Sequence, residues 1–354
     1  MNEPSHRNEP GAAPRMVDIA RAAGVHQSTV SRALRGDPAL PEATRQRLTA
    51  LAEAMGYRPN PLVSALIAER KRGRPSGKGS VLAVLSAGKR PDEWRNPPQG
   101  SYAQLYGYMQ AHAHQLGYRL EEFALGDPGI GPARLQQILL SRGIRGIILA
   151  PMPLEVKEMD FDLRDFAAVA LRLYLQRPLL DRVSPDYFSV MMSALQKLEE
   201  SGHRRIGFLS STGVDERVRH RSLGAYLVNR QQASRRYLKP LVLENWSEHA
   251  FLDWVRKGNP DALITSIYPQ YVKARQSLQG NGWSLPRDMS VINLDCHRDT
   301  NEAGMVHHLK LEAVSAINFL TKKVESADFG VPAQSCRLSI PGCWRDGETF
   351  ALRG

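Results

Sequence analysis

The feature that most constrains the fold is the alternation of apolar strands and amphipathic helices from Ser80 onward. The apolar run VLAVLSA at 81–87 predicts a buried strand, and a helical pattern follows near Tyr102–Leu116. Further strand-like segments recur, with helical patterns between most of them, at 118–124, 145–150, 166–171, 205–210, 239–243, 261–266 and 289–294. Because parallel strands of one sheet need crossover helices, this alternation predicts a mostly parallel, doubly wound α/β sheet.

The segment before Ser80 has a different pattern. Residues 1–15 are polar and Pro-rich, which predicts a disordered tail, and residues 16–61 contain three short helical patterns. Residues 62–79 join a short apolar segment to a basic run with Gly, Pro and Ser, a composition typical of linkers. We therefore expect a small all-α domain at 16–61, a linker at 62–79 and an α/β domain at 80–354.

The charge balance favours a polyanionic partner. The chain has 47 Lys and Arg against 36 Asp and Glu, and residues 1–80 hold 13 of the basic residues against 7 acidic ones. Cys296, Cys336 and Cys343 lack metal-ligand spacing and predict free thiols in a reducing compartment. There is no apolar leader and no run of about 18 apolar residues, so we expect a cytoplasmic protein without a membrane span, a metal or a cofactor.

A helix-turn-helix pattern occupies residues 17–34, VDIARAAGVHQSTVSRAL. Small residues such as Ala20 let a second helix approach the first closely, and Gly24 suits the left-handed position that ends a helix. A third helical pattern, Glu42–Met55 followed by Gly56, supplies apolar side chains for a small core. The pattern predicts three packed helices.

The second helix of this pattern has two distinct faces at about 100° per residue. Val30, Ala33 and Leu34 fall on one side and predict a buried stripe. The opposite side carries polar side chains that can bond base edges in a DNA major groove, since arginine can pair with guanine and glutamine with adenine. The candidate DNA-binding residues of this helix are Gln27, Ser28, Thr29, Ser31 and Arg32. The alternative is an amphipathic helix with an ordinary solvated face.

The short segment Asn60–Ala68 predicts a helix that forms only on a partner. Asn60 is a plausible N-cap and Pro61 suits the first helical position. Isolated helices need about 12–15 residues to be marginally stable in water, so this one should form only when packed. Two copies packed together in a DNA minor groove would supply that contact, with Leu66 as an apolar wedge. The alternative is a plain linker whose apolar residues cover a domain surface.

Residues 16–68 resemble the head of the lactose-repressor (LacI/GalR) family. The match covers D-I-A-x-x-A-G-V-x-x-x-T-V-S-R-x-L, then T-R-x-x-L, then G-Y-x-P-N-x-x-x-x-x-L. The resemblance implies base-reading or intercalating roles for Gln27, Ser28, Arg32 and Leu66. His26 stands where the family usually has Ser, and Pro41 also replaces a usual Ser before the third helix.

The resemblance continues more weakly through the α/β domain. GHRRIGFL at 202–209 matches a family strand, RSLG at 221–224 resembles R-x-x-G, and SVINLD at 290–295 resembles S-V-x-G-F-D. This resemblance implies a periplasmic-binding-protein-like pair of doubly wound parallel-sheet subdomains with an effector cleft between them. The expected limits are about 80–203 plus 308–328 for the N-subdomain, and about 204–307 plus 329–354 for the C-subdomain.

The effector is expected beyond the carboxyl ends of the strands, where such sheets bind ligands. By resemblance Arg221 and Asp295 face the effector, and the alternative for each is a surface charge or a structural ion pair. Further candidates, for which a packing or structural role is the alternative, are Ser266, Tyr268, Tyr102 and Asp186.

By resemblance the chain is expected to be a DNA-binding transcriptional regulator, a repressor controlled by a small molecule such as a sugar or a derivative. We expect a homodimer on a pseudo-palindromic operator, because one short helix reads only a few base pairs. An enzyme is disfavoured, since G-x-S-x-G, P-loop and H-E-x-x-H motifs are missing from the sequence. The alternative is a solute-binding protein of the same α/β fold without a regulatory role.

Overall fold

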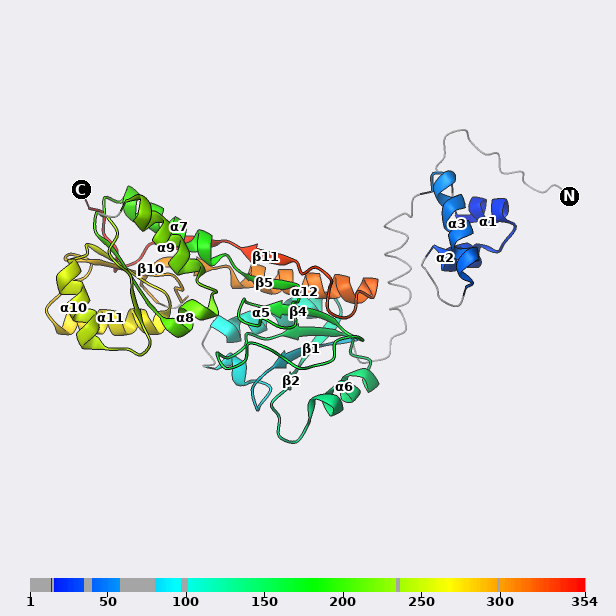
Figure 1. Cartoon of the computed structure of the whole chain (residues 1–354), viewed down its shortest axis with the longest axis horizontal. Coiled ribbons are helices and arrows are strands. Elements are labelled where there is room, and N and C mark those ends of the chain that lie inside the picture. Colours follow the sequence, from blue (N-terminus) through cyan, green and yellow to red (C-terminus); the bar gives the residue numbers. More distant parts are fainter. Residues whose placement is uncertain are drawn as a thin grey trace. The chain divides into compact units, whose positions relative to one another are not determined.

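The computed structural model describes residues 14, 16–34, 40–57, 80–96, 101–233, 236–297 and 300–353 (Figure 1). The chain divides into two units, Met1–Ser76 and Gly77–Gly354, close to the predicted boundary at Ser80. The predicted linker 62–79, which includes the candidate residue Leu66, lies outside the described residues, as do Asn60 and nearly all of the predicted tail.

The described part of the first unit contains three helices, α1 (Met16–Ala23), α2 (Gln27–Ala33) and α3 (Glu42–Ala54). Their apolar faces meet in one small core formed by Ile19, Ala20, Val30, Ala33, Leu48 and Ala52. Gly24 ends α1 with a φ of +66°, and Gly56 closes α3 with a φ of +70°. Glycine adopts this left-handed conformation without steric cost, so both turns can be sharp. The predicted helix-turn-helix domain is confirmed.

The described part of the second unit holds two six-stranded sheets. The first sheet is parallel throughout, in the order β2 (Tyr118–Ala124), β1 (Ser80–Ser86), β3 (Gly146–Leu149), β4 (Ala167–Leu171), β5 (Arg182–Pro185) and β11 (Arg337–Ile340). Helices α5 (Ser101–Gln115) and α12 (Leu309–Ser326) cover one face, and α6 (Pro132–Ser141) packs on the other. A short 3-10 helix, η1 (Glu93–Arg95), follows β1. Because helices cover both faces, the inner strands are apolar on both sides.

The second sheet repeats this arrangement. Its order is β7 (Leu241–Leu243), β6 (Ile206–Ser211), β8 (Ala262–Thr265), β9 (Ser290–Asn293), β10 (Ala303–His307) and β12 (Gly342–Arg345), and β10–β12 is antiparallel. Helices α7 (Tyr187–Glu200) and α9 (Arg221–Gln232) pack on one face, with α10 (Glu248–Gly258) and α11 (Tyr268–Gly280) on the other. The short helix α8 (Thr212–Arg217) directly follows β6. The predicted pair of mostly parallel, doubly wound sheets is confirmed.

The structure corrects two of the predicted subdomain limits. Helix α7 packs in the core of the second sheet through side chains such as Val190 and Leu198, so 187–200 belong to the second subdomain rather than to the first. Strand β11 pairs with β5, so 337–340 belong to the first subdomain rather than to the second. The chain crosses between the sheets three times: after β5, after β10 and between β11 and β12. The apolar stripe of a helix does not indicate which of two similar sheets it covers.

Candidate functional site

The N-terminus of α2 is capped by the residue that departs from the family pattern. His26 precedes the helix with an extended backbone, and its Nδ1 accepts a hydrogen bond from the Ser28 N–H at 3.3 Å. The same nitrogen lies 2.8 Å from Ser28 Oγ. An acceptor at this position satisfies one of the orphan amides of the first turn, so His26 performs the capping that a serine would perform. Pro41, before α3, provides no side-chain cap.

The two faces of α2 are arranged as the periodicity predicts. Val30 and Ala33 are buried in the helical core, and Leu34 packs partly against it. Gln27 and Ser28 are exposed, while Thr29, Ser31 and Arg32 are half-buried. The first unit therefore presents a row of hydrogen-bonding side chains along one short helix.

A cavity of about 680 Å³ lies between the carboxyl ends of the two sheets in the second unit. Its walls come from both subdomains: α5 and the loop after β4 on one side, and the loops after β6, β8 and β9 on the other. Residues that line it include Tyr102, Arg172, Tyr187, Ser210, Ser211, Asp215, Arg217, Ser222, Glu244, Ser266, Tyr268, Asp295, His297 and His307. A molecule bound here would touch both subdomains at once.

Four of the six predicted effector residues line this cavity. Tyr268 stacks on His297, with ring centroids 4.5 Å apart and an interplanar angle of 21°. The Ser266 hydroxyl donates to Ser210 Oγ at 2.8 Å. Asp295 follows β9 and Tyr102 lies on the first turn of α5, so both stand at sheet ends, where the strand pattern places them.

Asp186 and Arg221 are not among the described residues that line the cavity. The Asp186 carboxylate caps α7 instead, accepting from the Ser189 N–H at 3.1 Å and from the Ser189 hydroxyl at 2.8 Å. Arg221 begins α9 directly after Arg219 and His220, which both have a φ of +57°. After that left-handed turn, Ser222 rather than Arg221 lines the cavity.

Arg172 is a central cavity residue that the sequence patterns did not single out. Its Nη1 donates to the Tyr187 hydroxyl at 3.1 Å, and its guanidinium carbon lies 5.4 Å from the centroid of the Tyr102 ring. Its Nε lies 3.2 Å from Oε1 of Glu312, an ion pair without hydrogen-bond geometry between these atoms. Burial lowers the pKa of Arg172, but Glu312, Tyr187 and Tyr102 together more than reverse this, so the net pKa lies above its usual range and the group stays charged.

His307 is the second unpredicted residue of the cavity wall. Its side chain is 8% exposed, and its Nε2 lies 3.8 Å from Oδ1 of Asp295. Its Nδ1 is buried without a hydrogen-bond partner. Burial lowers the pKa of His307 to about 4, although Asp295 opposes this shift. The imidazole is therefore neutral at neutral pH.

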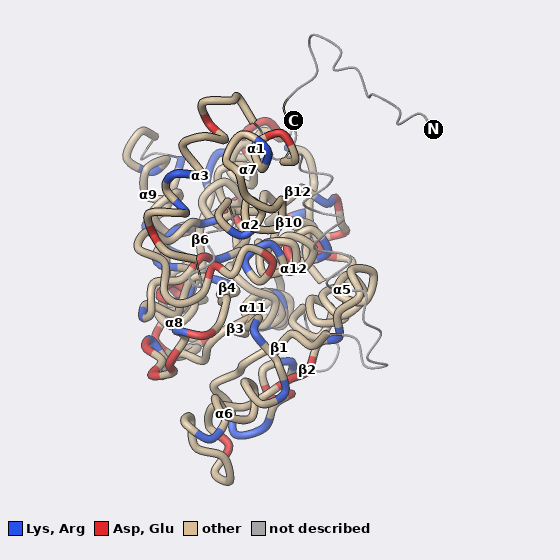
Figure 2. The backbone as a smooth tube through the Cα atoms, turned by 90° about the vertical axis from the view of Figure 1, so that its right-hand side faces the viewer, with Lys and Arg blue, Asp and Glu red and all other residues tan. Residues whose placement is uncertain are grey.

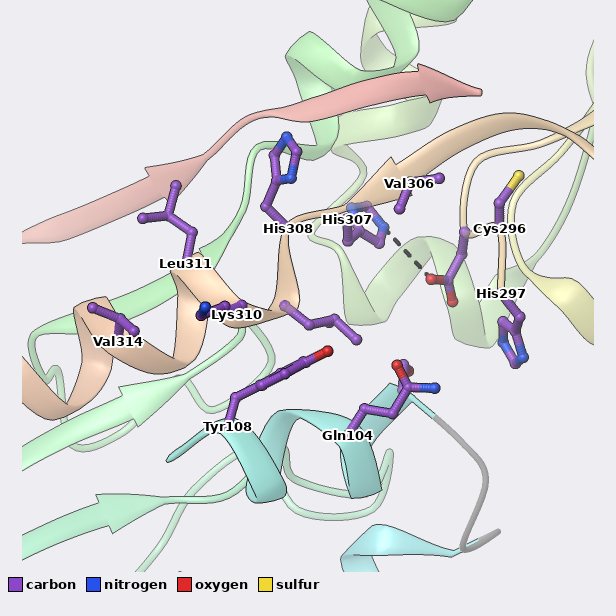
Figure 3. A pocket seen from close by; sticks show the side chains of 13 residues that line it. Gln104, Tyr108, Cys296, His297, Val306, His307, His308, Lys310, Leu311 and Val314 are labelled. Carbon is purple, nitrogen blue, oxygen red and sulfur yellow. Dashed lines mark ion pairs between the residues drawn. The ribbon is translucent and has the colours of Figure 1, made fainter. Parts of the chain in front are cut away.

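A second cavity of about 440 Å³ adjoins the first and shares Ser101, Asp295, His297 and His307 with it (Figure 3). Gln104 and Tyr108 on α5 face the start of α12 across this space, as Figure 3 shows. The rest of its lining combines the apolar side chains of Val306, Leu309, Leu311 and Val314 with those of Cys296, His308 and Lys310. The sequence contains a signal for this wall, because the spacing of Ser101, Gln104 and Tyr108 puts all three on one face of a helix.

Comparisons with known proteins match both units. Residues 15–60 match the family model of bacterial regulatory proteins of the lacI family, and residues 195–308 match the periplasmic binding protein-like domain. The HTH-type transcriptional regulator PtxS of Pseudomonas plecoglossicida is 28% identical, over 78% of this chain and 78% of its own length. An uncharacterised HTH-type transcriptional regulator of Streptomyces limosus is 26% identical, over 83% of this chain and 82% of its own.

Solved structures share the fold over almost the whole chain. The cellobiose complex of the transcriptional regulator CelR has a TM-score of 0.57 at 18% identity and covers 95% of this chain and 100% of its own. No helix in the described ranges is long and apolar enough to cross a membrane. The curated relatives are transcriptional regulators rather than enzymes. The chain therefore combines a lacI-type helix-turn-helix domain with a periplasmic-binding-protein-like domain, and it is similar in both parts to DNA-binding transcriptional regulators of the LacI/GalR family.

Proposed function

We propose that this regulator is a cytoplasmic repressor that binds a pseudo-palindromic operator as a homodimer and changes its affinity for DNA when a sugar or sugar derivative binds. One observation carries the proposal: a polar recognition-type helix and a cavity enclosed by two subdomains occur in the same chain. A solute-binding protein without a regulatory role would have no use for the lacI-type domain at 15–60.

The exposed side of α2 supports direct contact with DNA bases. Gln27 and Ser28 stand in the first turn, where a recognition helix meets base edges, and Arg32 stands one turn further on. Thr29 and Ser31 flank this row and suit phosphate or base contacts. Because so short a helix reaches only a few base pairs, two copies on an inverted repeat are needed for useful specificity.

Replacing Arg32 by alanine should weaken binding to the operator by about 1–3 kcal/mol and leave binding to unrelated DNA nearly unchanged. The reason is that a base contact is lost only where the right base is present. Fluorescence anisotropy at one fixed salt concentration, with an operator duplex and a scrambled duplex, measures both affinities. Arg47→Ala, an exposed arginine on α3, removes the same charge and serves as the control. If both variants lowered the two affinities by equal factors, Arg32 would not read bases.

The lining of the cavity supports a hydroxyl-rich effector. Ser210, Ser211 and Ser266 offer hydroxyl groups, Arg172 and Asp295 offer a donor fork and an acceptor, and Tyr268 offers a ring face. Two solved structures of this fold, those of CelR and of the lac repressor, carry cellobiose and ONPG respectively. A thermal-shift screen of carbohydrates and nucleobases with the full chain tests this proposal. We expect the largest rise in Tm from a carbohydrate; a rise only with nucleobases would contradict the sugar assignment.

A further inference from the structure

The cavities of about 680 and 440 Å³ meet at a polar junction. Its residues are those that line both cavities: Ser101, Asp295, His297 and His307. The Asp295 carboxylate lies in this junction, with Oδ1 3.8 Å from Nε2 of His307, and the dashed line in Figure 3 marks this pair. The two cavities are therefore neighbouring compartments of one cleft rather than separate sites.

His307 gives the junction a buried polar atom that lacks a partner. Its side chain is 8% exposed, and within the described chain its Nδ1 has no hydrogen-bond partner. The ring packs edge-to-face against Tyr187, with centroids 5.8 Å apart and an interplanar angle of 79°. A buried polar atom without a partner costs free energy, which a ligand oxygen at the junction would recover. Because neutral imidazole donates at one nitrogen and accepts at the other, a hydroxyl or a glycosidic oxygen suits this position.

Beyond the junction the lining changes in character. Val306, Leu309, Leu311 and Val314 line the second cavity from β10 and α12, and Tyr108 faces the start of α12 from α5 (Figure 3). The serine hydroxyls of the loops after β6 and β8 line the first cavity instead. An apolar group would leave water here without losing hydrogen bonds, so the second cavity suits an apolar part of a ligand.

The charges around both cavities favour a neutral ligand. Basic and acidic residues are interspersed along the described chain (Figure 2), and the cavity linings share this balance. The first cavity is lined by Arg95, Arg172, Arg217, Asp215, Glu244 and Asp295. The second is lined by Asp295 and by Lys310, which is exposed and can keep its ammonium group in water. A charged ligand would favour an excess of the opposite charge, which neither lining has.

We propose that the second cavity is an aglycone site, so that the effector is a neutral glycoside whose non-sugar group is aryl or short alkyl. The proposal rests on the proposed function, in which a sugar occupies the first cavity. The glycosidic oxygen then lies beside His307, and the aglycone contacts Val306, Leu309 and Val314. Because α5 belongs to the first subdomain and the chain crosses between the sheets after β10, the aglycone binds against one of the crossovers.

Isothermal titration of the full chain with methyl and phenyl glycosides tests this site. Both anomers of the D-glucosides and D-galactosides are titrated, so that the comparison does not depend on one sugar. For a sugar whose methyl glycoside binds, we expect the phenyl glycoside to bind at least about tenfold more tightly, because its ring is removed from water. Its binding should also have the more negative heat-capacity change, which marks buried apolar surface.

Two variants alter the second cavity at residues that do not line the first. Val314→Phe fills part of the space, and Leu311→Asp places a charge at a wall position that is 47% exposed, where it should not disturb folding. Each should lower the affinity for the phenyl glycoside at least about tenfold and bind the methyl glycoside like the unchanged chain. The matched control is Leu116→Asp, the same change at an exposed leucine that lines neither cavity.

Equal affinities for the methyl and phenyl glycosides would overturn the aglycone site and leave the sugar effector in place. A phenyl glycoside that binds both variants as tightly as it binds the unchanged chain would also overturn it. If no sugar and no glycoside binds, the sugar assignment of the proposed function fails, and the aglycone site fails with it.

Discussion

Replacing Glu312 by glutamine is expected to lower the free energy of unfolding by about 3–5 kcal/mol. The Glu312 side chain is 1% exposed and faces Arg172, which is 8% exposed, across 3.2 Å. Burial raises the pKa of Glu312 above its usual value and the adjacent guanidinium offsets this only in part, but at pH 7 we expect the carboxylate to be ionised beside Arg172. Glutamine has nearly the same shape but no charge, so the variant leaves Arg172 buried without a counter-ion. Urea denaturation at pH 7 measures the change.

Two further variants separate charge from packing. Glu216→Gln breaks the half-exposed pair with Lys157, and it should cost no more than about 1 kcal/mol because water screens that pair. The double variant Arg172→Met/Glu312→Leu removes both buried charges and should recover most of the stability lost in Glu312→Gln. Equal losses in Glu312→Gln and Glu216→Gln would show that the buried ion pair does not hold the first subdomain together.

The stability of the second unit is expected to fall as the pH drops from about 6.5 toward 4, largely through His307. Its pKa lies near 4 in the folded chain, while an unfolded histidine has a value of 6.5, so the unfolded state binds the proton more readily. The stabilisation is therefore complete above pH 6.5 and is lost as the pH falls through this window. The groups around the ring are Asp295, Arg172 and His308, and the last two oppose protonation. The loss between pH 7 and pH 4.5 should be about 2–3 kcal/mol.

His307→Gln should flatten this part of the pH profile, since glutamine does not titrate. The variant is compared with His249→Gln, which removes an exposed histidine on α10 and should keep the original profile. The buried His203 also has a lowered pKa, because of its burial, so part of the dependence remains in both variants. Identical pH profiles for His307→Gln and the unchanged chain would mean that the pKa of His307 is nearly the same in the folded and the unfolded chain.

The strand–helix alternation was sufficient to predict most of the sheet strands. The runs expected at 118–124 and 166–171 correspond to β2 and β4. The patterns missed β5, β10, β11 and β12. These strands are four or five residues long, and they contain Arg, Pro, Gly or His in place of a continuous apolar run. Their pairing depends on sheets that form elsewhere in the chain, so local periodicity does not reveal them.

A site residue could be predicted from the sequence where its role depends only on the helix or strand that carries it. The faces of α2 follow from helical spacing, and Asp295 follows from its place after a strand. Arg172 was missed because its significance comes from Glu312, a residue far away in the sequence on α12. Arg221 matches a family pattern, but Ser222 rather than Arg221 lines the cavity after the left-handed turn at Arg219 and His220. The pattern of side chains in the sequence does not reveal such a turn.

Coupling between the cavity and the DNA-binding domain is the defining property of an effector-controlled regulator. It is tested most directly by the Kd of the full chain for a duplex selected from a random DNA pool, measured with and without the carbohydrate that most raises the Tm. We expect the selected duplex to contain an inverted repeat, and the saturating carbohydrate to change its Kd by about 5–150-fold, while the Kd for scrambled DNA changes little. The same Kd for the selected duplex with and without the carbohydrate would contradict control of DNA binding from the cavity.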